Sequence, residues 1–551
     1  MIGEPHWFGP ASSWFGLLHS PSPALRGAVV VCPPLGYEAV GSHRSLRRLA
    51  EHLTSIGIAS LRVGYPGMSF GLPDEPGVDQ VPVWSAIITG AAQELRSMGA
   101  PWVGVIGVRF AATLAADLAS DAGFDAVVAW DPVVNGRRYA RALKILAAHT
   151  DGEAATDEVT VAGVEFAPAT LAAVGRQSFA VPAGTPTLVI QRTESSIDPP
   201  LDQQGVAVVQ IAGTAAMLDV DAELSVVPQE VLDHIAGWLD EHAPPPADRG
   251  LSPATRSAVV QEADVPLRRD ALRIGGSRLF AMTTRIDGTD PTRAVLFLNN
   301  GASMAIGPGG AWLDWADEVA RLGALAVQMD FSGLGESPPA EGAGEQVVYT
   351  PMAARNVRDV VDYLRSHGIE HVTTIGLCSG ALLALDAVVA DSGVDHLVAI
   401  NSRFDKPFTD ARRHDRSAAG TNRFLAIPLS KAPLFPSFQK VPTWVWRLLA
   451  RLHLVAAPTV ALRRALLAGT RITLVFGTDE WGLRALERRD PAGWEAIRRH
   501  PRLATVVLAE LDHSMFDPAG RAAVEDQMRR LVWPTLTSTP DTPHPSLGAT
   551  S

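Results

Sequence analysis

The sequence predicts two α/β domains in tandem, each built on a doubly wound, mostly parallel sheet. Three observations support this fold class. The chain has 551 residues, more than the ~250 that one α/β domain usually contains. Short, continuous apolar runs alternate with helical segments, which is typical of buried parallel strands joined by crossover helices. The same succession occurs twice, with a period of roughly half the chain.

In the first half, apolar runs at 28–31, 60–63 and 102–106 predict three strands. A helical segment through 46–50 separates the first two, and a Pro-Gly turn follows each of them. Each run is bounded by turn residues and is short enough to be a strand rather than a helix.

The second half repeats this order, with predicted strands at 294–298, 324–330 and 371–375 and a helix around 315–320. Two further strands are expected at 472–476 and 504–508. We therefore expect the two halves to share one strand order.

Composition places the boundary between the halves. Three consecutive prolines, 244–246, end the helix before them and begin a stretch without apolar periodicity. We expect a first domain at 1–242, a linker at 243–257 and a second domain at 258–534. Residues 535–551, rich in Pro, Ser and Thr, are expected to be disordered.

Charge and cysteine content exclude several function classes. The net charge of −12 argues against nucleic acid as a partner. Only 2 cysteines are present and they form no closely spaced pair, so a disulfide framework is not expected. The N-terminus has no signal-peptide pattern, and we find no run of ~18 apolar residues, so we expect a cytoplasmic protein with no membrane partner. We expect no cofactor and no metal, because the sequence contains neither a P-loop nor a histidine motif of the HxH or HExxH type.

The segment Gly376-Leu377-Cys378-Ser379-Gly380 lies between a predicted strand and a predicted helix. A sharp turn at this junction needs flanking glycines and presents its middle residue at the helix N-terminus, where an anion is favoured. Cys378 occupies that middle position, so we predict it to be a nucleophile.

Suitable partners for this thiol follow two later strands. Asp479 comes after the strand at 472–476, and His513 comes after the strand at 504–508. We predict that His513 is the general base and then the acid, and that Asp479 orients its imidazole.

The order of nucleophile, acid and base is the order seen in α/β hydrolases. The chain resembles this superfamily over both halves. The second half is similar to members with a cysteine elbow, such as dienelactone hydrolases and the hydrolases associated with exosortase systems. Residues 330–337, DFSGLGES, also resemble the DxxGxGxS strand end of the superfamily. The chain has Asn300-Gly301 where most members have His-Gly.

The resemblance implies an oxyanion hole made by backbone N–H groups. One would come from Ser379 and the other from Ala302 or Ser303. Three alternatives are open: Ser379 as the nucleophile, Glu480 as the triad acid, and Asp512 as a residue that orients the histidine loop. Cys32 is expected to be an inert buried thiol.

Aligning the two halves leaves the catalytic places of the first half without suitable residues. Arg109 is opposite Cys378, Thr193 is opposite Asp479 and Ala215 is opposite His513. Because an arginine is no nucleophile near neutral pH, the first half is expected to be a degenerate copy. Arg109 would either hold an anionic ligand or pair with a nearby acid.

A long insertion at 402–471 occupies the place where the superfamily carries its lid, and we expect it to be helical. It contains 13 Lys and Arg against 3 Asp and Glu. This basic segment either docks an acyl carrier protein or the phosphates of coenzyme A, or is a solvated face. Its most clustered candidates are Arg412, Arg413, Arg416 and Arg423.

The sequence thus predicts a Cys-dependent acyl-transfer enzyme that hydrolyses an ester or thioester through an acyl-Cys intermediate. One alternative is an acyltransferase or cyclase acting on a carrier- or coenzyme A-tethered chain. Another is a non-catalytic protein that binds acyl groups or carriers.

Overall fold

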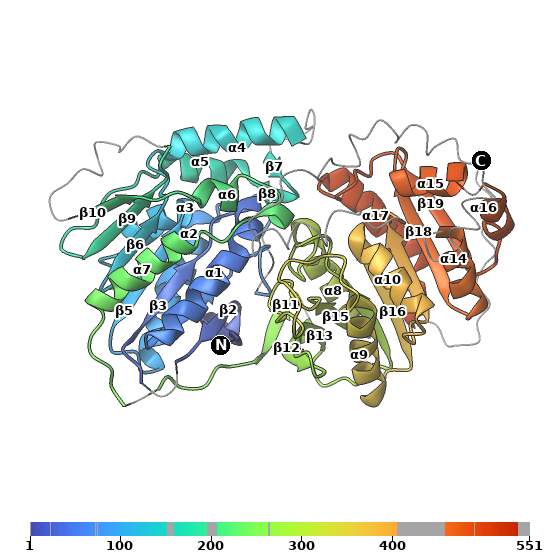
Figure 1. The fold of residues 1–551 in the computed structure, drawn as a ribbon, viewed down its shortest axis with the longest axis horizontal. Helices are drawn as coiled ribbons and strands as arrows, with labels where there is room; N and C mark the ends of the chain where they lie inside the picture. The colour runs from blue at the N-terminus through green and yellow to red at the C-terminus, as the bar shows by residue number, and fades with distance from the viewer. Residues whose placement is uncertain are drawn as a thin grey trace.

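The computed structural model describes residues 2–21, 24–71, 73, 75–150, 159–194, 206–248, 250–262, 265–404, 458–489 and 491–537. Two sheets dominate this part of the chain, and Figure 1 shows them side by side, with the blue-to-green half next to the yellow-to-red half. We call residues 2–242 the first domain and residues 257–537 the second domain.

The first domain contains an eight-stranded sheet of order β1-β2-β4-β3-β5-β6-β9-β10. The strands from β4 to β10 are parallel, while β1 and β2 are antiparallel to their neighbours. Helices α1 and α7 cover one face, and α2 and α3 cover the other. The described strands are β1 (Glu4–Phe8), β2 (Trp14–His19), β3 (Gly27–Cys32), β4 (Ile58–Val63), β5 (Val103–Val108), β6 (Val127–Trp130), β9 (Thr187–Gln191) and β10 (Ala207–Gln210), with a separate hairpin of β7 (Val159–Val161) and β8 (Val164–Phe166). The helices are α1 (Tyr37–Ser55), α2 (Val81–Ser97), α3 (Phe110–Asp117), α4 (Gly136–Thr150), α5 (Pro168–Arg176), α6 (Thr214–Leu218) and α7 (Gln229–His242), with short 3-10 turns at Pro10–Ser12 and Ala222–Leu224.

The second domain has a nine-stranded sheet in the described residues, of order β11-β12-β13-β15-β14-β16-β17-β18-β19. Without β11, this order is that of the first sheet, so the expected common topology is present. Helices α9, α10 and α14 cover one face, and α8 and α17 cover the other. The strands are β11 (Ser257–Glu262), β12 (Val265–Ile274), β13 (Leu279–Ile286), β14 (Arg293–Phe297), β15 (Leu325–Met329), β16 (His371–Leu377), β17 (His396–Ile400), β18 (Arg471–Gly477) and β19 (Leu503–Leu508). The helices are α8 (Ala311–Arg321), α9 (Ala353–Ser366), α10 (Ser379–Val389), α14 (Pro458–Leu467), α15 (Trp481–Arg489), α16 (Pro491–Ile497), α17 (Pro518–Leu531) and α18 (Pro534–Thr537), preceded by a 3-10 turn at Pro308–Gly310.

The predicted strands all appear, because most of the apolar runs are buried between helices on both faces. The exception is β19 at the sheet edge, where Val507 is 48% exposed. The prediction that residues 535–551 are disordered is wrong for residues 535–537. Residues 535–537 belong to α18, because Leu536 packs on Trp533 in the core under α17. Of the lid at 402–471, the structure describes 402–404 and the segment from 458, which includes α14.

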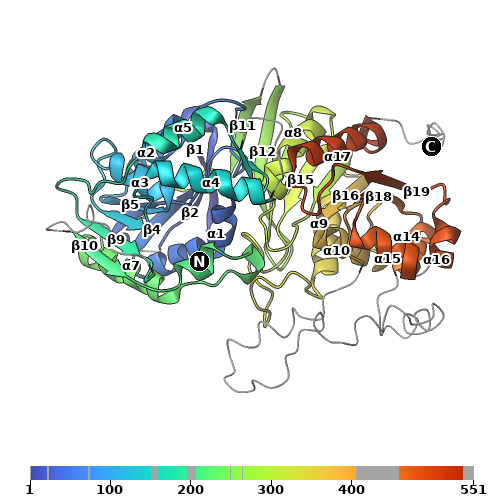
Figure 2. The ribbon, with the colours of Figure 1, turned by 90° about the horizontal axis from the view of Figure 1, so that it is seen from above.

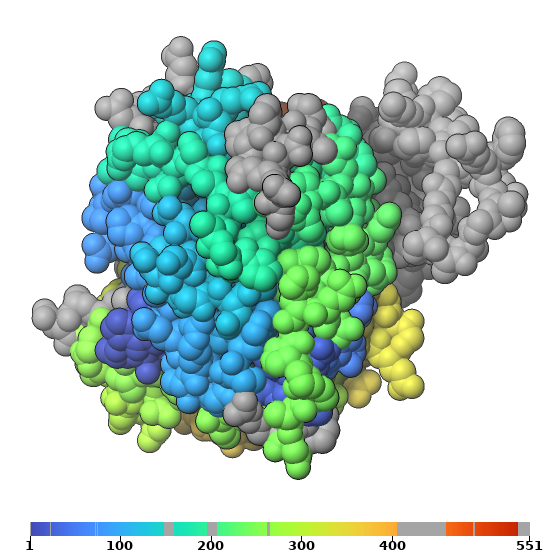
Figure 3. Space-filling model, turned by 90° about the vertical axis from the view of Figure 1, so that its left-hand side faces the viewer, coloured from blue at the N-terminus to red at the C-terminus, as the bar shows by residue number. Residues whose placement is uncertain are grey.

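A shared apolar core joins the two domains. Phe15 and Phe70 of the first domain pack edge to face at 5.4 Å between ring centroids, and Phe70 packs against Phe280 of the second domain at 5.6 Å. In the view from above, β11 and β12, at one edge of the second sheet, lie next to the first domain (Figure 2). Seen from its own end, the first domain forms most of the visible surface and hides most of the second (Figure 3).

Arg269 on β12 is one of the buried charges at this junction. Its guanidinium donates to both oxygens of Asp317 at 2.8 and 2.7 Å, and to the carbonyls of Phe70 and Gly71 at 2.9 and 2.6 Å. Both charged side chains are only 5% exposed. One residue thus neutralises a buried carboxylate in the second domain and satisfies two carbonyls in the first.

We expect Arg269→Ala to lower the free energy of unfolding by about 3–5 kcal/mol, because it leaves the buried Asp317 charge uncompensated. Urea denaturation followed by circular dichroism measures the change. Arg268→Ala is the matched control. Its side chain is 37% exposed, so we expect a loss of at most about 1 kcal/mol. Equal losses in the two variants would contradict this account of the junction.

Candidate active site

Cys378 lies at the junction of β16 and α10, in a strained turn. It is the N-cap of α10 and has φ 52° and ψ −109°, a conformation that non-glycine residues rarely adopt. A Cβ added to Gly376 would lie 2.4 Å from the carbonyl carbon of Gly380, and one added to Gly380 would lie 2.4 Å from the carbonyl oxygen of Asn299. Only glycine therefore fits on either side of the turn, as the sequence pattern predicts.

His513 lies in the loop between β19 and α17, with its ring next to this turn. Its Nε2 is 3.1 Å from Sγ of Cys378, so the two predicted residues are brought together from 135 positions apart in the chain. Asp512 holds this loop, because its carboxylate accepts the backbone N–H groups of Ser514, Phe516 and Asp517, each at 3.1 Å. The expected orienting role of Asp512 is thus confirmed.

The carboxylate beside the imidazole is Glu480, and the prediction of Asp479 in this position is wrong. The Nδ1 atom of His513 lies 2.9 Å from Oε2 and 3.1 Å from Oε1 of Glu480. The Asp479 side chain is 87% exposed and pairs with Arg484. The turn after β18, in which the N–H of Glu480 donates to the carbonyl of Gly477, buries residue 480 and leaves residue 479 in solvent.

Hydrogen bonds to Cys378 and Glu480 raise the pKa of His513 to about 10, although burial opposes the shift. The ring is therefore protonated at neutral pH in this arrangement. The increase in pKa stabilises the folded protein fully below pH 6.5, and this contribution is lost as the pH rises through about 10.

Asn401, at the end of β17, connects the acid loop to the histidine loop, and sequence reasoning missed it. Its Nδ2 donates to the carbonyls of Asp512 and His513 at 2.8 and 3.1 Å, and its Oδ1 accepts the N–H of Gly477 at 2.9 Å. The residue is fully buried with φ 45°. The sequence did contain a signal for it, because Asn401 is a polar residue directly after an apolar strand, at the carboxyl edge of the sheet.

The residues predicted for an oxyanion hole lie beside the elbow, but not all of their backbone N–H groups are free to bind a ligand. The N–H of Ser303 donates to the carbonyl of Asn300 at 3.1 Å and is thus already engaged. The backbone N–H groups of Ala302 and Ser379 donate to no acceptor within the described ranges. The Ser379 hydroxyl is buried and accepts the N–H of Gly301 at 2.7 Å, so it anchors the loop to the elbow.

The matching turn of the first domain holds Arg109, with φ 57° and ψ −123°. Its guanidinium pairs with Glu38 at 2.9 Å and Asp131 at 3.0 Å and lies over the ring of Tyr139. Of the two expectations for Arg109, pairing with nearby acids is the one the geometry shows.

Thr193 follows β9 and Ala215 lies in α6 after β10, so neither supplies an acid or a base at these places. With the acid of the second domain at 480, its counterpart in the first domain is Glu194, whose carboxylate accepts a hydrogen bond from Thr193 at 3.0 Å. This half therefore retains a carboxylate there, but Ala215 stands where the imidazole would be.

Other predicted features lie partly or wholly outside the described residues. This applies to the basic candidates Arg412, Arg413, Arg416 and Arg423. Within the described ranges, no three His, Cys, Asp or Glu side chains are grouped to hold a metal. No described helix is long and apolar enough to cross a bilayer.

Comparison with known proteins agrees with this geometry. Residues 295–534 match the model of the alpha/beta hydrolase family. The second domain is an α/β-hydrolase domain. It contains the elbow, the acid loop and the histidine loop in the order that this fold uses. No curated protein matches the chain.

Several solved structures are similar in part. Est1E from Butyrivibrio proteoclasticus matches with 14% identity and a TM-score of 0.33, covering 43% of this chain and 98% of its own. The thioesterase domain from the curacin biosynthetic pathway matches with 15% identity and a TM-score of 0.31, covering 48% and 99%. TT1662 from Thermus thermophilus matches with 14% identity and a TM-score of 0.31, covering 50% and 99%.

Glu480→Gln is expected to lower the pKa of His513 by about one unit, equivalent to about 1.4 kcal/mol. The variant removes one of the two interactions that raise this pKa, and water screens the partly exposed pair. NMR titration of the His513 ring measures the change. Asp479→Asn is the matched control and should leave the titration where it is. A larger effect of the Asp479 variant would restore Asp479 as the partner of the imidazole.

Proposed function

We propose that the second domain hydrolyses an ester or thioester through an acyl intermediate on Cys378. The observation that carries this proposal is the chain of contacts from Sγ of Cys378 through the His513 ring to Glu480. A protonated imidazole beside the sulfur favours a thiolate, which is the nucleophilic form of cysteine. The turn presents the sulfur at the N-terminus of α10, where the helix dipole also favours a negative charge.

In the first half-reaction the thiolate attacks the acyl carbon, and the carbonyl oxygen becomes an oxyanion. The N–H groups of Ser379 and Ala302, which donate to no acceptor among the described residues, would donate to this oxyanion. As the tetrahedral intermediate collapses, the bond to the leaving alkoxide or thiolate breaks. His513 gives its proton to that leaving group, so an acyl-Cys thioester and a neutral imidazole remain.

In the second half-reaction the neutral His513 takes a proton from water, and the resulting hydroxide attacks the acyl-Cys carbon. Collapse releases the carboxylic acid and returns the thiolate and the imidazolium. Glu480 stabilises the positive ring whenever it forms and keeps Nε2 directed at the sulfur. Transfer of the acyl group to another nucleophile, or cyclisation, would use the same intermediate, but each needs a second bound group, so we favour hydrolysis.

For the substrate we propose a small acyl ester or thioester, because a thiolate exchanges one thioester for another at little cost in free energy. Coenzyme A and carrier-protein thioesters belong to this class. Acetyl-coenzyme A and the acetyl thioester of N-acetylcysteamine have the same reacting group and differ in the phosphates. A lower KM for the coenzyme A ester at low ionic strength, lost in salt, would support recognition of the phosphates. Equal KM values would show that the acyl group alone is recognised.

We expect Cys378→Ala to reduce thioester hydrolysis by at least about 1,000-fold, because it removes the group that forms the covalent intermediate. Intact mass spectrometry after incubation with an acyl thioester should show one acyl adduct on the unmodified protein and none on this variant.

Cys32→Ala is the matched control, since it removes the only other thiol, which is fully buried. It should keep both the adduct and the activity. Ser379→Ala should lower the rate only about 10-fold, by loss of the hydrogen bond to Gly301. Unchanged turnover in Cys378→Ala would end the catalytic proposal, and complete loss in Ser379→Ala alone would move the nucleophile to the hydroxyl.

A further inference from the structure

A cavity of about 90 Å³ lies between the two domains, away from the described contacts of Cys378. It is lined by residues that follow β3 and β4 in the first domain and β14 and β15 in the second. The carboxyl ends of parallel strands from both sheets thus meet at one hollow. In open α/β sheets this edge is where ligands bind.

Most of the cavity wall is apolar and comes from both domains. Phe15, Leu17 and Phe70 contribute from the first domain, and Phe280 and Ile306 contribute from the second. An apolar wall with a few polar groups at one end is the usual construction of a small-molecule site.

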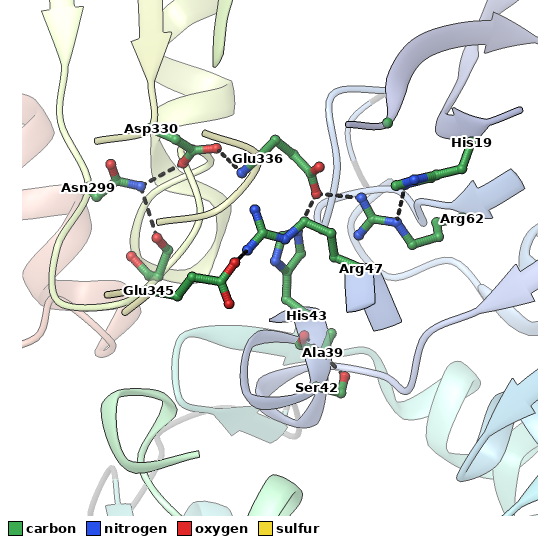
Figure 4. Close-up of polar contacts among 12 residues, drawn as sticks. His19, Ala39, Ser42, His43, Arg47, Arg62, Asn299, Asp330, Glu336 and Glu345 are labelled. Atoms are coloured by element: carbon green, nitrogen blue, oxygen red, sulfur yellow. Dashed lines mark hydrogen bonds and ion pairs between the residues drawn. The ribbon is translucent and has the colours of Figure 1, made fainter. Parts of the chain in front are cut away.

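The polar end of the cavity is a buried cluster around Glu336 (Figure 4). One oxygen of Glu336, Oε1, accepts from Arg62 at 2.6 Å and from His43 at 2.7 Å. The other oxygen, Oε2, is buried and has no hydrogen-bond partner among the described residues. The Glu336 side chain is 5% exposed. A buried acceptor without a donor is costly, so a group that donates to Oε2 would stabilise this end of the cavity.

The charges around Oε2 restrict what that donor can be. Burial opposes ionisation of Glu336, but the positive charges of Arg62 and Arg47 and the hydrogen bond from His43 hold its pKa well below the usual range, so it is a carboxylate. Burial lowers the pKa of His43 despite its contact with Glu336, which makes it a neutral donor. Burial raises the pKa of Asp330, at the same end, to about 7.

Arg62 therefore balances Glu336 directly, and Arg47 pairs with Glu345 at 2.6 Å. Arg48 also pairs with Glu345, at 3.0 Å, so three arginines balance three carboxylates even when Asp330 is ionised. No excess of negative charge is therefore left to bind an ammonium group. A carboxylate ligand would accept hydrogen bonds only and could not donate to Oε2. A hydroxyl group donates one hydrogen bond and brings no charge.

We propose that this interdomain cavity binds a small neutral alcohol, with its carbon chain against the aromatic wall and its hydroxyl donating to Oε2 of Glu336. Scaled from the about 150 Å³ that holds the six carbons of benzene, the volume suits about four non-hydrogen atoms. Because the cavity is not enclosed, a fifth atom fits at its mouth. Met304 and Ile306 form part of the wall, and the loop they belong to also carries Gly301 and Ala302. An alcohol bound there touches the loop that is bonded to the elbow of the second domain, through the N–H of Gly301 and the hydroxyl of Ser379.

The probe is 1-butanol, titrated into the full-length chain and followed by saturation-transfer NMR. Diethyl ether has the same atoms but no donor, and we expect it to bind about 10-fold more weakly, the equivalent of one hydrogen bond. Butyrate should not bind, and butylammonium should bind more weakly than butanol. Tighter binding of butylammonium, or equal binding of the ether, would overturn the assignment of a neutral donor.

Two variants locate the site. Ala39→Leu fills the cavity from α1, and Ile306→Phe fills it from the second domain, so each should abolish butanol binding in a protein that keeps its circular dichroism spectrum. Val40→Leu, on the same helix but outside the cavity wall, is the matched control and should bind normally. Unchanged binding in both filled variants, or no binding of butanol to the unmodified protein, would overturn the proposal. None of these measurements involves turnover, so they stand apart from the proposed role of Cys378.

Discussion

The geometry of the candidate active site depends on one strained backbone position, residue 378. A positive φ at a non-glycine residue is stable only where its surroundings enforce it. Here the enforcement is steric on both sides, since neither Gly376 nor Gly380 has room for a side chain. The turn fixes the direction of the Cys378 side chain, and the contact with Nε2 of His513 follows only if the histidine loop is held equally firmly. Asn401 supplies that constraint by bonding to both the histidine loop and the acid loop.

The two domains show that the same strained turn can hold side chains of different chemistry. Arg109 and Cys378 have nearly the same dihedral angles at the same junction of strand and helix. In the first domain the position carries a guanidinium between Glu38 and Asp131. Ion pairs therefore occupy the place where the Cys378 thiol stands in the second domain. The same strained turn thus holds a paired guanidinium in one domain and a thiol in the other.

The sequence was sufficient for features that depend on local pattern. Buried parallel strands are recognisable because helices cover both of their faces, and the elbow is recognisable because only glycine fits beside residue 378. The choice between Asp479 and Glu480 was not predictable in this way. Two adjacent carboxylates follow the same strand, and the turn at Gly477, held by Asn401 from another strand, decides which one is buried. The helical end at 535–537 was missed for a related reason, because composition does not show that Leu536 has a core to pack against.

Contacts between the domains were equally invisible in the sequence, yet they extend to the active-site loop. A side chain at Gly301 would place its Cβ 2.5 Å from the carboxylate of Glu223 in the first domain. Gln346, from the second domain, donates to the carbonyl of the neighbouring Ala222 at 2.6 Å. The first domain thus lies directly against the loop whose N–H groups face the elbow. Since a loop is positioned by whatever packs on it, the first domain shapes the candidate site of the second by contact, although it has Arg109 and Ala215 at the places of Cys378 and His513.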